Sequence, residues 1–576
     1  MEGKENDMQA VLYAHVSEGH YEWRISLDRT MMMDWAYWAR NTSDVALMRW
    51  PELLPYGVAI GLLNDEEELA RMVDKLCHAS RPDATENLWK QELDTLADSM
   101  KGRSLLPEEF TSLAGHLLGD TLSMEWTSLA QLGYLSGWMS YGHSVRVRTK
   151  RGWFGLRPYT EAICQRCGAT GQSLRWSDCA SCGERCPYCE VCLGMGRSRY
   201  CTPLLRGVGD LRVVESIGRW EDMLPELKLS PAQAAAAAEG VRFVREGRFS
   251  GEVGEQAIRS FLIWAVTGAG KTEMIYPLIA AERSRGGRVL IATPRKDVVL
   301  ELLPRLRAAF AGEQVVALYG GSEQRWESAS ITVATTHQLL RYEAAFDLVV
   351  LDEVDAFPYH GDPMLAYAAH KACKPGAAFV MLSATPPPEL QRAVKSGKLP
   401  CVKVPVRYHR HPLPVPVLRG PGRLLPLLRQ SLERGAQGFV FVPQIARLAP
   451  ELARLRRLLA PGCAPGAIDA TSSQDPMRAE KVRRFRTGEI RILLTTTILE
   501  RGVTIPKADV VVLGADSRLF DAAALVQMAG RAGRSAEDPY GKVAFLAKHR
   551  TREQYAACRQ IRAMNRLARR LGYLRE

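Results

Sequence analysis

The chain has 576 residues, 46% of them hydrophobic and 24% charged, a composition typical of folded globular proteins and unlike that of disordered or fibrous ones. One hydrophobic core cannot serve so long a chain, so we expect roughly three to five domains. The formal net charge of +12 favours an anionic partner, either nucleic acid or an acidic membrane surface. The N-terminus lacks the pattern of a secretory signal, and every apolar run is shorter than the roughly 18 residues of a membrane helix, so we expect a cytoplasmic protein.

Residues 1–140 hold seven of the 12 tryptophans and no motif of recognisable chemistry. The stretch YEWRISLD alternates as a strand does, whereas EEELARMVDKL has helical periodicity. We therefore expect an N-terminal α+β region of unassigned role, whose aromatic side chains pack in a core. A binding platform built from these rings is the alternative. The basic stretch at 144–158 that follows predicts either a strand and turn that contact phosphate or a solvated connector.

Eight of the 13 cysteines fall between Cys164 and Cys201, mostly in C-x-x-C spacing. In a chain without a secretory signal, this density indicates a metal site more than disulfides or redox thiols. Each C-x-x-C turn can present two thiolates to one tetrahedral Zn²⁺, and a site closed by four thiolates leaves no position for water, so the expected role is structural. We expect a zinc module over residues 160–205. Its preferred primary site is Cys164, Cys167, Cys189 and Cys192. A second site would use Cys179, Cys182 and Cys186, with or without Cys201.

After the cysteines, short apolar runs alternate with helical segments. Each run is continuous and is followed by a polar turn, as in a buried strand of a parallel sheet. The first series is FLIWAV, RVLIAT, QVVALYG, SITVATT, FDLVVLDE and AAFVMLSAT, and the second is GFVFVP, GAIDAT, IRILLTTT, VVVLGA and KVAFLA. Two such series predict two doubly wound lobes, over residues 215–398 and 405–576, with functional loops at the carboxyl ends of the strands. The proline-rich segment 404–423 between them is typical of a linker.

The sequence AVTGAGKT (265–272) follows the first apolar run and matches a phosphate-binding loop. Gly268 and Gly270 allow the backbone to curl, so that N–H groups converge on phosphate oxygens at a helix N-terminus. Lys271 supplies positive charge for the β- and γ-phosphates, and Thr272 supplies a hydroxyl for Mg²⁺. Upstream, Gln233 is placed to read the adenine edge through its amide. The candidate residues for ATP and Mg²⁺ are Gln233, Thr267, Gly268, Ala269, Gly270, Lys271, Thr272 and Asp352.

The segment FDLVVLDEVD places Asp352 and Glu353 directly after a fully apolar run. Asp352 can hold Mg²⁺, and Glu353 can orient and deprotonate the attacking water. An acidic helix cap uses the same residue types, but it needs no phosphate-binding loop upstream, and here one is present. The two motifs together predict ATP hydrolysis, with Lys271, Asp352 and Glu353 as catalytic residues.

These and five further motifs resemble helicase superfamily two over roughly residues 225–550. The resemblance implies that TPR and ATTHQLLR grip a nucleic-acid backbone, that Ser383 and Thr385 of SATP link hydrolysis to strand movement, and that TTTILERGVTIP (495–506) contacts nucleotide and strand. The implied nucleic-acid residues are Thr293, Pro294, Arg295, Thr335, Thr336, His337 and Thr496. The expected fold class is α/β: two RecA-like doubly wound parallel-sheet lobes, preceded by a cysteine-rich zinc module and an N-terminal α+β region.

In the same resemblance, QMAGRAGR (527–534) carries the catalytic residues of the second lobe, Gln527, Arg531 and Arg534. An arginine that reaches from one lobe to the γ-phosphate bound on the other makes hydrolysis depend on closure of the cleft. Arg531 and Arg534 are three residues apart, so on a helix both would face that cleft. The alternative is that these two arginines are a basic pair on the protein surface.

The cysteine module ahead of the first lobe, together with CPYCEVCLGMGR, DEVDAFP and RYHRHPLPVP, resembles the ComFA family over approximately residues 160–575. This resemblance implies an ATP-dependent single-stranded DNA translocase or helicase that drives uptake of transforming DNA during natural competence. It also implies work at the inner face of the cell membrane, beside the DNA-uptake channel and with a ComFC-type competence protein. The first 140 residues and the eight-cysteine cluster go beyond the compact form of the family.

Three other functions compete with this interpretation. A replication-restart helicase of the PriA type also combines C-x-x-C turns with this motor, but its zinc module follows the first lobe. A DEAD-box RNA helicase would ordinarily carry DEAD where this chain has DEVD, and would lack the cysteines. A non-enzymatic zinc scaffold would not need an intact set of catalytic residues.

The C-terminal segment 548–576 carries nine Lys or Arg against two Glu. This charge can follow a phosphate backbone or bind anionic lipid, which would give peripheral membrane association. The spacing of its apolar residues predicts instead that one face packs on the second lobe. That face comprises Tyr555, Ile561, Met564, Leu567 and Leu571.

Overall fold

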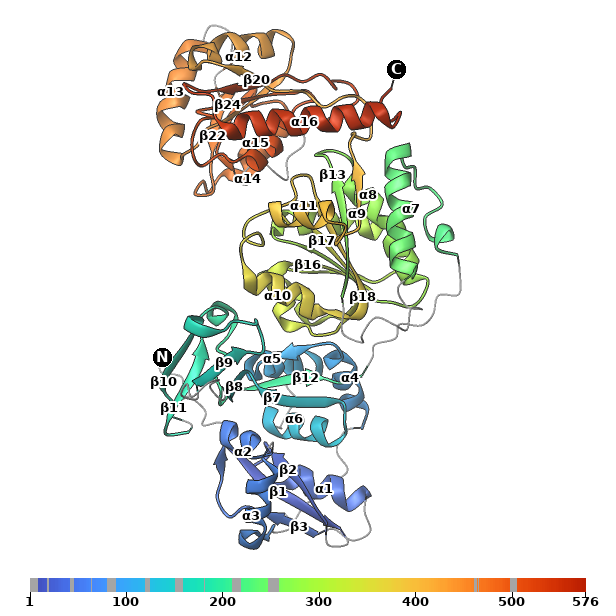
Figure 1. Cartoon of the computed structure of the whole chain (residues 1–576), viewed down its shortest axis with the longest axis vertical. Helices are drawn as coiled ribbons and strands as arrows, with labels where there is room; N and C mark the ends of the chain where they lie inside the picture. The colour runs from blue at the N-terminus through green and yellow to red at the C-terminus, as the bar shows by residue number, and fades with distance from the viewer. Residues whose placement is uncertain are drawn as a thin grey trace.

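The computed structural model describes residues 9–17, 20–41, 46–63, 65–79, 90–119, 125–150, 159–180, 182–209, 219–246, 258–459, 464, 466–497 and 505–575. The parts of the chain are stacked in a column (Figure 1). The N-terminal part lies at the bottom, a middle part with the cysteines lies above it, and two α/β lobes follow, with the C-terminal lobe at the top.

The N-terminal part is an antiparallel sheet with helices, as expected for an α+β region. Its elements are β1 (Gln9–Ser17), β2 (His20–Ser26), α1 (Met32–Asn41), β3 (Ala46–Arg49), β4 (Leu54–Pro55), α2 (Tyr56–Leu62), α3 (Glu66–Met72) and β5 (Cys77–His78). The strand order is β2-β1-β3-β5, with β4 also on β1. Six of the seven N-terminal tryptophans lie in or against apolar cores, which confirms the packing prediction. The seventh, Trp89, lies outside the described residues.

The middle part joins the cysteine segment to the residues before it. Its elements are α4 (Lys90–Met100), β6 (Ser104–Leu105), α5 (Pro107–Leu118), α6 (Trp126–Leu135), β7 (Met139–His143), β8 (Val145–Lys150), β9 (Tyr159–Cys164), β10 (Leu174–Asp178), β11 (Arg185–Cys189) and β12 (Pro203–Gly207). Two hairpins, β8–β9 and β10–β11, carry cysteines, and β12 then returns to pair with both β6 and β7. The cysteine segment thus shares a sheet with residues 104–143. Of the basic stretch 144–158, the residues after 150 lie outside the described residues.

Lobe 1 is a parallel sheet of order β15-β16-β14-β17-β18-β13-β19 with helices on its faces. Its elements are α7 (Pro231–Glu246), β13 (Arg259–Ala265), α8 (Lys271–Arg283), β14 (Val289–Thr293), α9 (Lys296–Ala309), β15 (Val315–Leu318), β16 (Ile331–Thr335), the 3₁₀ helix η7 (Thr336–Arg341), β17 (Phe346–Asp352), α10 (Pro363–Ala372), β18 (Cys373–Ser383), α11 (Pro388–Lys395) and β19 (Cys401–Val404). The strands before β19 coincide with the apolar runs of the first series. The sheet extends beyond the expected boundary at residue 398, because β19 pairs with β13.

Lobe 2 is a parallel sheet of order β20-β25-β24-β21-β23-β22. Its elements are β20 (Val417–Arg419), α12 (Leu424–Glu433), β21 (Gln437–Phe441), α13 (Leu448–Leu459), β22 (Ile468–Thr471), α14 (Arg478–Arg486), β23 (Ile492–Thr495), β24 (Ala508–Leu513), α15 (Ala522–Ala529), β25 (Val543–Leu546) and α16 (Arg552–Arg570). The proline-rich segment contains β20, so only residues 405–416 connect the lobes without regular structure. Apolar side chains from both lobes belong to one buried cluster, which includes Val266, Leu413 and Val526.

The C-terminal helix α16 packs on α15, but not with the whole predicted face. Ile561 and Met564 are buried, whereas Tyr555 and Leu571 are 44% and 46% exposed. The prediction was wrong for these two residues because the buried stripe is made largely of small side chains such as Ala557. In the described part of the chain, no helix combines the length and the apolar character that crossing a membrane requires.

A buried ionic junction fastens the middle part to lobe 1. The Glu109 carboxylate on α5 accepts hydrogen bonds from Arg166, between the first two cysteines (2.6 Å), and from Arg341, the last residue of η7 (2.8 Å). The Arg166 side chain is fully buried, and those of Glu109 and Arg341 are 11% and 12% exposed. Burial lowers the pKa of Arg341, and Glu109 opposes that shift. One carboxylate therefore compensates two buried cations from different parts of the chain.

We expect Glu109→Gln to reduce the free energy of unfolding by about 3–5 kcal/mol, because it leaves two buried guanidinium groups without a counter-charge. Urea unfolding followed by tryptophan fluorescence measures the loss. Glu108→Gln is the matched control, since Glu108 is the exposed neighbour on the same helix. Equal stabilities of the two variants would contradict this role of the junction.

Candidate active site and cysteine clusters

A cavity of about 320 Å³ opens between the two lobes and receives side chains from both. Its walls hold most of the residues that the sequence predicts for ATP. Those from lobe 1 are Thr267, Gly268, Gly270, Lys271, Thr272, Glu273, Val298, Glu301, Leu302, Arg305, Asp352 and Glu353, and the others are Tyr408, Gln527, Arg531 and Arg534. Side chains that are far apart in the sequence thus share one pocket.

The floor of this cavity is the turn between β13 and α8. Gly268 and Gly270 have φ values of +79° and +73°, which L-residues with side chains rarely adopt. The turn directs the N-terminus of α8, which begins at Lys271, toward the cavity, and such a terminus is suited to phosphate. The Gln233 side chain lies beneath the turn, because its amide donates to the carbonyls of Ala269 (2.9 Å) and Gly270 (3.3 Å). Its predicted contact with adenine stays a prediction.

The acidic pair lies at the carboxyl end of β17, beside the phosphate-binding turn. Lys271 Nζ donates to Asp352 Oδ1 over 3.1 Å, and the backbone N–H of Glu353 donates to the same oxygen over 2.8 Å. Glu353 has φ +58°, a left-handed conformation uncommon for a residue with a side chain. These positions suit a carboxylate that holds Mg²⁺ beside the phosphates and a neighbouring base for water.

Arg531 and Arg534 reach the cavity from a turn and not from a helix. The expected helical continuation is wrong, because α15 ends at Ala529 and Gly533 takes a left-handed conformation with φ +63°. The Arg534 guanidinium donates to the Gly530 carbonyl over 3.0 Å. Burial lowers the pKa of Arg534 to about 10, while the nearby carboxylates of Glu301 and Glu353 oppose that shift. Arginine side chains carry a positive charge in proteins, so both residues bring positive charge from lobe 2 to the wall of the cavity.

A second polar network crosses between the lobes behind this cavity. Asp355, two residues after Glu353, accepts hydrogen bonds from Ser383 Oγ (2.7 Å) and Thr385 Oγ1 (2.5 Å). Gln527 from lobe 2 donates to Thr385 Oγ1 (3.1 Å) and to Asp355 (3.3 Å). The sequence motifs contained Asp355, but its role was not predicted. The signal that could have identified it is the pair of buried hydroxyls in SATP, which need an acceptor.

The predicted nucleic-acid residues of lobe 1 lie together at one edge of its sheet. Thr293 ends β14 and is the register partner of Thr335, which ends β16. Among the described residues, the buried hydroxyls of Thr293 and Thr336 have no hydrogen-bond partner, whereas His337 and Arg295 are partly exposed. In lobe 2, Thr496 directly follows β23, and residues 498–504 of its motif lie outside the described residues. The remaining predicted residue, Pro294, is buried beside Thr293.

The eight cysteines form two separate sets of four, and the ligand atoms within each set lie within 4.8 Å of one another. The first set is Cys164, Cys167, Cys189 and Cys192, and the second is Cys179, Cys182, Cys186 and Cys201. In the first set the Cys164–Cys192 and Cys167–Cys189 sulfurs are 3.9 and 3.5 Å apart. These separations exceed a disulfide bond and are close to the roughly 3.8 Å expected between sulfurs on a tetrahedral ion with Zn–S bonds of about 2.3 Å. Both donor sets therefore fit a structural zinc ion, and Cys201 completes the second.

Sequence reasoning missed two residues of the connecting segment. Arg407 is buried against the phosphate-binding turn, and Tyr408, which lines the cavity, offers an aromatic face on which a base can stack. Both belong to RYHRHPLPVP. A basic and aromatic stretch beside prolines gives no sign of burial, because only the approach of the two lobes encloses it.

Three family models match the chain in this order. The competence protein ComFA N-terminal domain matches residues 90–206, the DEAD/DEAH box helicase model matches 251–393, and the helicase conserved C-terminal domain matches 422–536. Residues 1–89 precede all three segments. The models correspond to the middle part and the two lobes.

Individual proteins show the same likeness. The chain is 40% identical over 468 residues to the competence protein ComFA of Bacillus subtilis (strain 168), covering 79% of this chain and 94% of that protein. It is 38% identical over 320 residues to the competence protein ComFA of Streptococcus pneumoniae (strain ATCC BAA-255 / R6), covering 53% and 73%. A solved structure of the DEAD-box helicase Mss116 bound to ssRNA and UDP-BeF has 17% identity and a TM-score of 0.43, covering 59% of this chain and 74% of that one.

Proposed function

Since this chain belongs to the ComFA family of competence proteins, we propose that it is the ATP-driven translocase that moves single-stranded DNA inward during natural transformation. Its helicase domains make it an ATP-hydrolysing enzyme of the type that acts on nucleic acid. The proposal adds the substrate and the process. The observation that carries it is the shared cavity, with Lys271, Asp352 and Glu353 on one side and two arginines on the other.

Hydrolysis coupled to movement follows from this arrangement. Lys271 and the N-terminus of α8 would bind the phosphates, Asp352 would hold Mg²⁺, and Glu353 would take the proton of the attacking water. Arg531 and Arg534 stabilise the charge that develops on the phosphoryl group, and they can do so only while lobe 2 is closed on lobe 1. The hydrogen bonds of Gln527 to Thr385 and Asp355 would couple closure of the lobes to the edge of lobe 1 that carries the predicted nucleic-acid residues.

The placement of backbone-binding groups supports a single strand as the track. Thr293 and Thr335 end neighbouring strands of lobe 1, and Thr471 and Thr495 end paired strands of lobe 2 in the same way. Hydroxyls and backbone N–H groups at such edges bind phosphates without reading bases. The formal net charge of +12 favours a polyanion.

We expect single-stranded DNA to raise the ATPase rate on the order of tenfold, because strand binding should favour the closed state in which the arginines reach the phosphates. Steady-state hydrolysis is measured without nucleic acid, with single-stranded DNA, and with RNA of matched length and sequence. Lys271→Ala is the control that should abolish hydrolysis under every condition. Equal stimulation by RNA would favour an RNA helicase, and no hydrolysis by the wild-type protein would favour a scaffold.

The role in competence is proposed from the family. We place the protein at the inner face of the cell membrane, where a DNA-uptake channel would deliver the strand and a ComFC-type competence protein would assist. The basic exposed side of α16 is suited to anionic lipid or to the incoming strand.

We expect cells carrying Glu353→Gln to lose transformation, because the strand would be bound but not drawn inward once water activation fails. Uptake of labelled DNA and the yield of transformants measure the effect. Glu389→Gln, an exposed change on α11, is the control that should transform normally. Normal transformation by Glu353→Gln, in protein shown to lack hydrolysis, would remove the competence assignment while leaving the motor.

We also propose that each cysteine set holds one structural Zn²⁺. The first set is part of the buried cluster of lobe 1, and Gly168 lies directly against the Tyr367 ring of α10. The second set joins the turn of the β10–β11 hairpin to Cys201, just before β12. A closed thiolate site can supply folding free energy but no catalytic water.

We expect two zinc ions per chain, measured by elemental mass spectrometry on purified protein. The paired change Cys164→Ala with Cys167→Ala should remove one ion, and Cys179→Ala with Cys182→Ala should remove the other, because two thiolates cannot close a tetrahedral site. Cys77→Ala, an exposed cysteine outside both sets, should retain both. A content of one ion in the wild-type protein would restrict the proposal to a single site.

A further inference from the structure

The segment that connects the two lobes contains a deeply buried arginine. Arg407, three residues after β19, is 1% exposed. Its Nε donates to the carbonyl of Thr267 in the phosphate-binding turn over 3.1 Å. Its terminal nitrogens donate to the carbonyls of Gly530 (3.2 Å), Ala532 (2.6 Å) and Gly533. One guanidinium therefore joins lobe 1 to the turn that carries the two catalytic arginines.

The chemistry of this contact is unusual for a buried cation. The partners that the structure records for Arg407 are backbone carbonyls and not carboxylates. Burial, together with the nearby positive charge of Arg534, lowers the pKa of Arg407 to about 9. A desolvated charge is tolerated where several fixed acceptors surround it. The planar guanidinium group of arginine has several N–H donors that point in different directions, so it can reach four carbonyls that surround it. The single terminal nitrogen of a lysine cannot.

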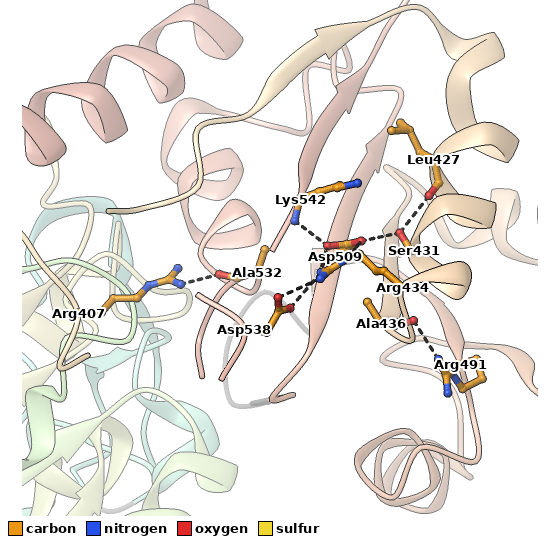
Figure 2. A network of polar contacts seen from close by, with 10 residues as sticks. All are labelled: Arg407, Leu427, Ser431, Arg434, Ala436, Arg491, Asp509, Ala532, Asp538 and Lys542. Carbon is orange, nitrogen blue, oxygen red and sulfur yellow. Dashed lines mark hydrogen bonds and ion pairs between the residues drawn. The ribbon is translucent and has the colours of Figure 1, made fainter. Parts of the chain in front are cut away.

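The turn that carries the catalytic arginines is also held on its lobe 2 side. Figure 2 shows Arg407 bonded to Ala532 at one end of this region and Arg434 bonded to Asp538 and Asp509 at the other. Arg434 donates to Asp538 over 2.9 Å and to Asp509 over 2.9 Å. The contacts of Arg434 thus hold this region on its lobe 2 side, and Arg407 holds the side that lies against the phosphate-binding turn.

The two lobes are also in tight contact at the same place. A Cβ atom built on Gly530 would lie 2.0 Å from Thr267 Oγ1, so only glycine permits this contact. Gly530 and Thr267 each offer their carbonyl to Arg407. The arginine therefore lies where a small relative movement of the lobes would break its hydrogen bonds.

We propose that Arg407 is a positioning residue for ATP hydrolysis, which seats Arg531 and Arg534 against the phosphate-binding turn when the lobes close. It does not touch the reacting atoms. Because the residue belongs to the covalent connection between the lobes, the connection itself takes part in closing the active site. This inference rests on the ATPase activity and is independent of the nature of the nucleic acid.

The test compares Arg407→Ala with the wild-type protein in single-turnover hydrolysis and in binding of a fluorescent ADP analogue. We expect kcat to fall on the order of 100-fold, as for a catalytic group displaced by about 1 Å. The Kd for the ADP analogue should stay within about threefold, which is smaller than the tenfold change that corresponds to about 1.4 kcal/mol. Arg407→Lys, which retains the charge without the fork, should fall on the order of tenfold. An unchanged kcat in Arg407→Ala, or a Kd that rises as much as kcat falls, would overturn the proposal. If Arg407→Ala does not fold, the kcat of Arg407→Lys decides by the same criteria.

Two further variants separate positioning from a general structural effect. Arg410→Ala changes the same segment, but Arg410 bonds the carbonyl of Tyr573 and not the catalytic turn, so its kcat should equal that of the wild type. The double variant Arg407→Ala with Arg531→Ala should be no slower than Arg531→Ala alone, because residues that act as a unit are not additive. A loss in Arg410→Ala like that of Arg407→Ala, or additive losses in the double variant, would show that Arg407 acts elsewhere.

Discussion

The residues that line the cavity between the lobes come from two separate sheets, and the contact between those sheets is therefore the constraint on which the candidate active site depends. Two observations define that contact. One is the hydrogen bond from Gln527 to Thr385, and the other is the close approach of Gly530 to Thr267. Neither lobe holds a complete site. Lobe 1 contributes the residues predicted to bind phosphate and activate water, and lobe 2 contributes Gln527, Arg531 and Arg534. Any movement that separates the lobes by more than a hydrogen-bond length would break the contact between Gln527 and Thr385.

The topology of the lobe 1 sheet places the phosphate-binding turn and the predicted nucleic-acid residues at the same edge. In lobe 1, β13 and β14 lie on opposite sides of β17 and β18, and the carboxyl ends of all these strands face the same edge. The nucleotide-binding turn follows β13, and Thr293 ends β14. Asp355 follows the strand between them and bonds both SATP hydroxyls. The phosphate-binding turn and the predicted nucleic-acid residues therefore lie along the same edge of one sheet, and a rotation of lobe 2 over that edge would affect both.

The middle part is joined to lobe 1 by a buried ionic contact. Glu109 binds Arg341, the last residue of the 3₁₀ helix that begins with Thr336 and His337. It also binds Arg166, which lies between two zinc-fitting cysteines. Glu109 thus joins the first cysteine set to the end of the segment that begins with Thr336 and His337, two of the predicted nucleic-acid residues. The buried charges make this junction costly to break.

The sequence alone determined the identity of the lobes, because buried parallel strands are continuous apolar runs and phosphate-binding turns need glycine and lysine at fixed spacing. It also indicated both cysteine sets, since C-x-x-C turns present thiolates in pairs. Only the tertiary structure decided what depends on the meeting of distant segments. The burial of Arg407, the acceptor role of Asp355, the end of α15 before Arg531 and the junction at Glu109 all arise where side chains from separate elements enclose one another. Local periodicity carries no record of such contacts, because a charged residue in a proline-rich connection has the same local pattern whether water or another lobe surrounds it.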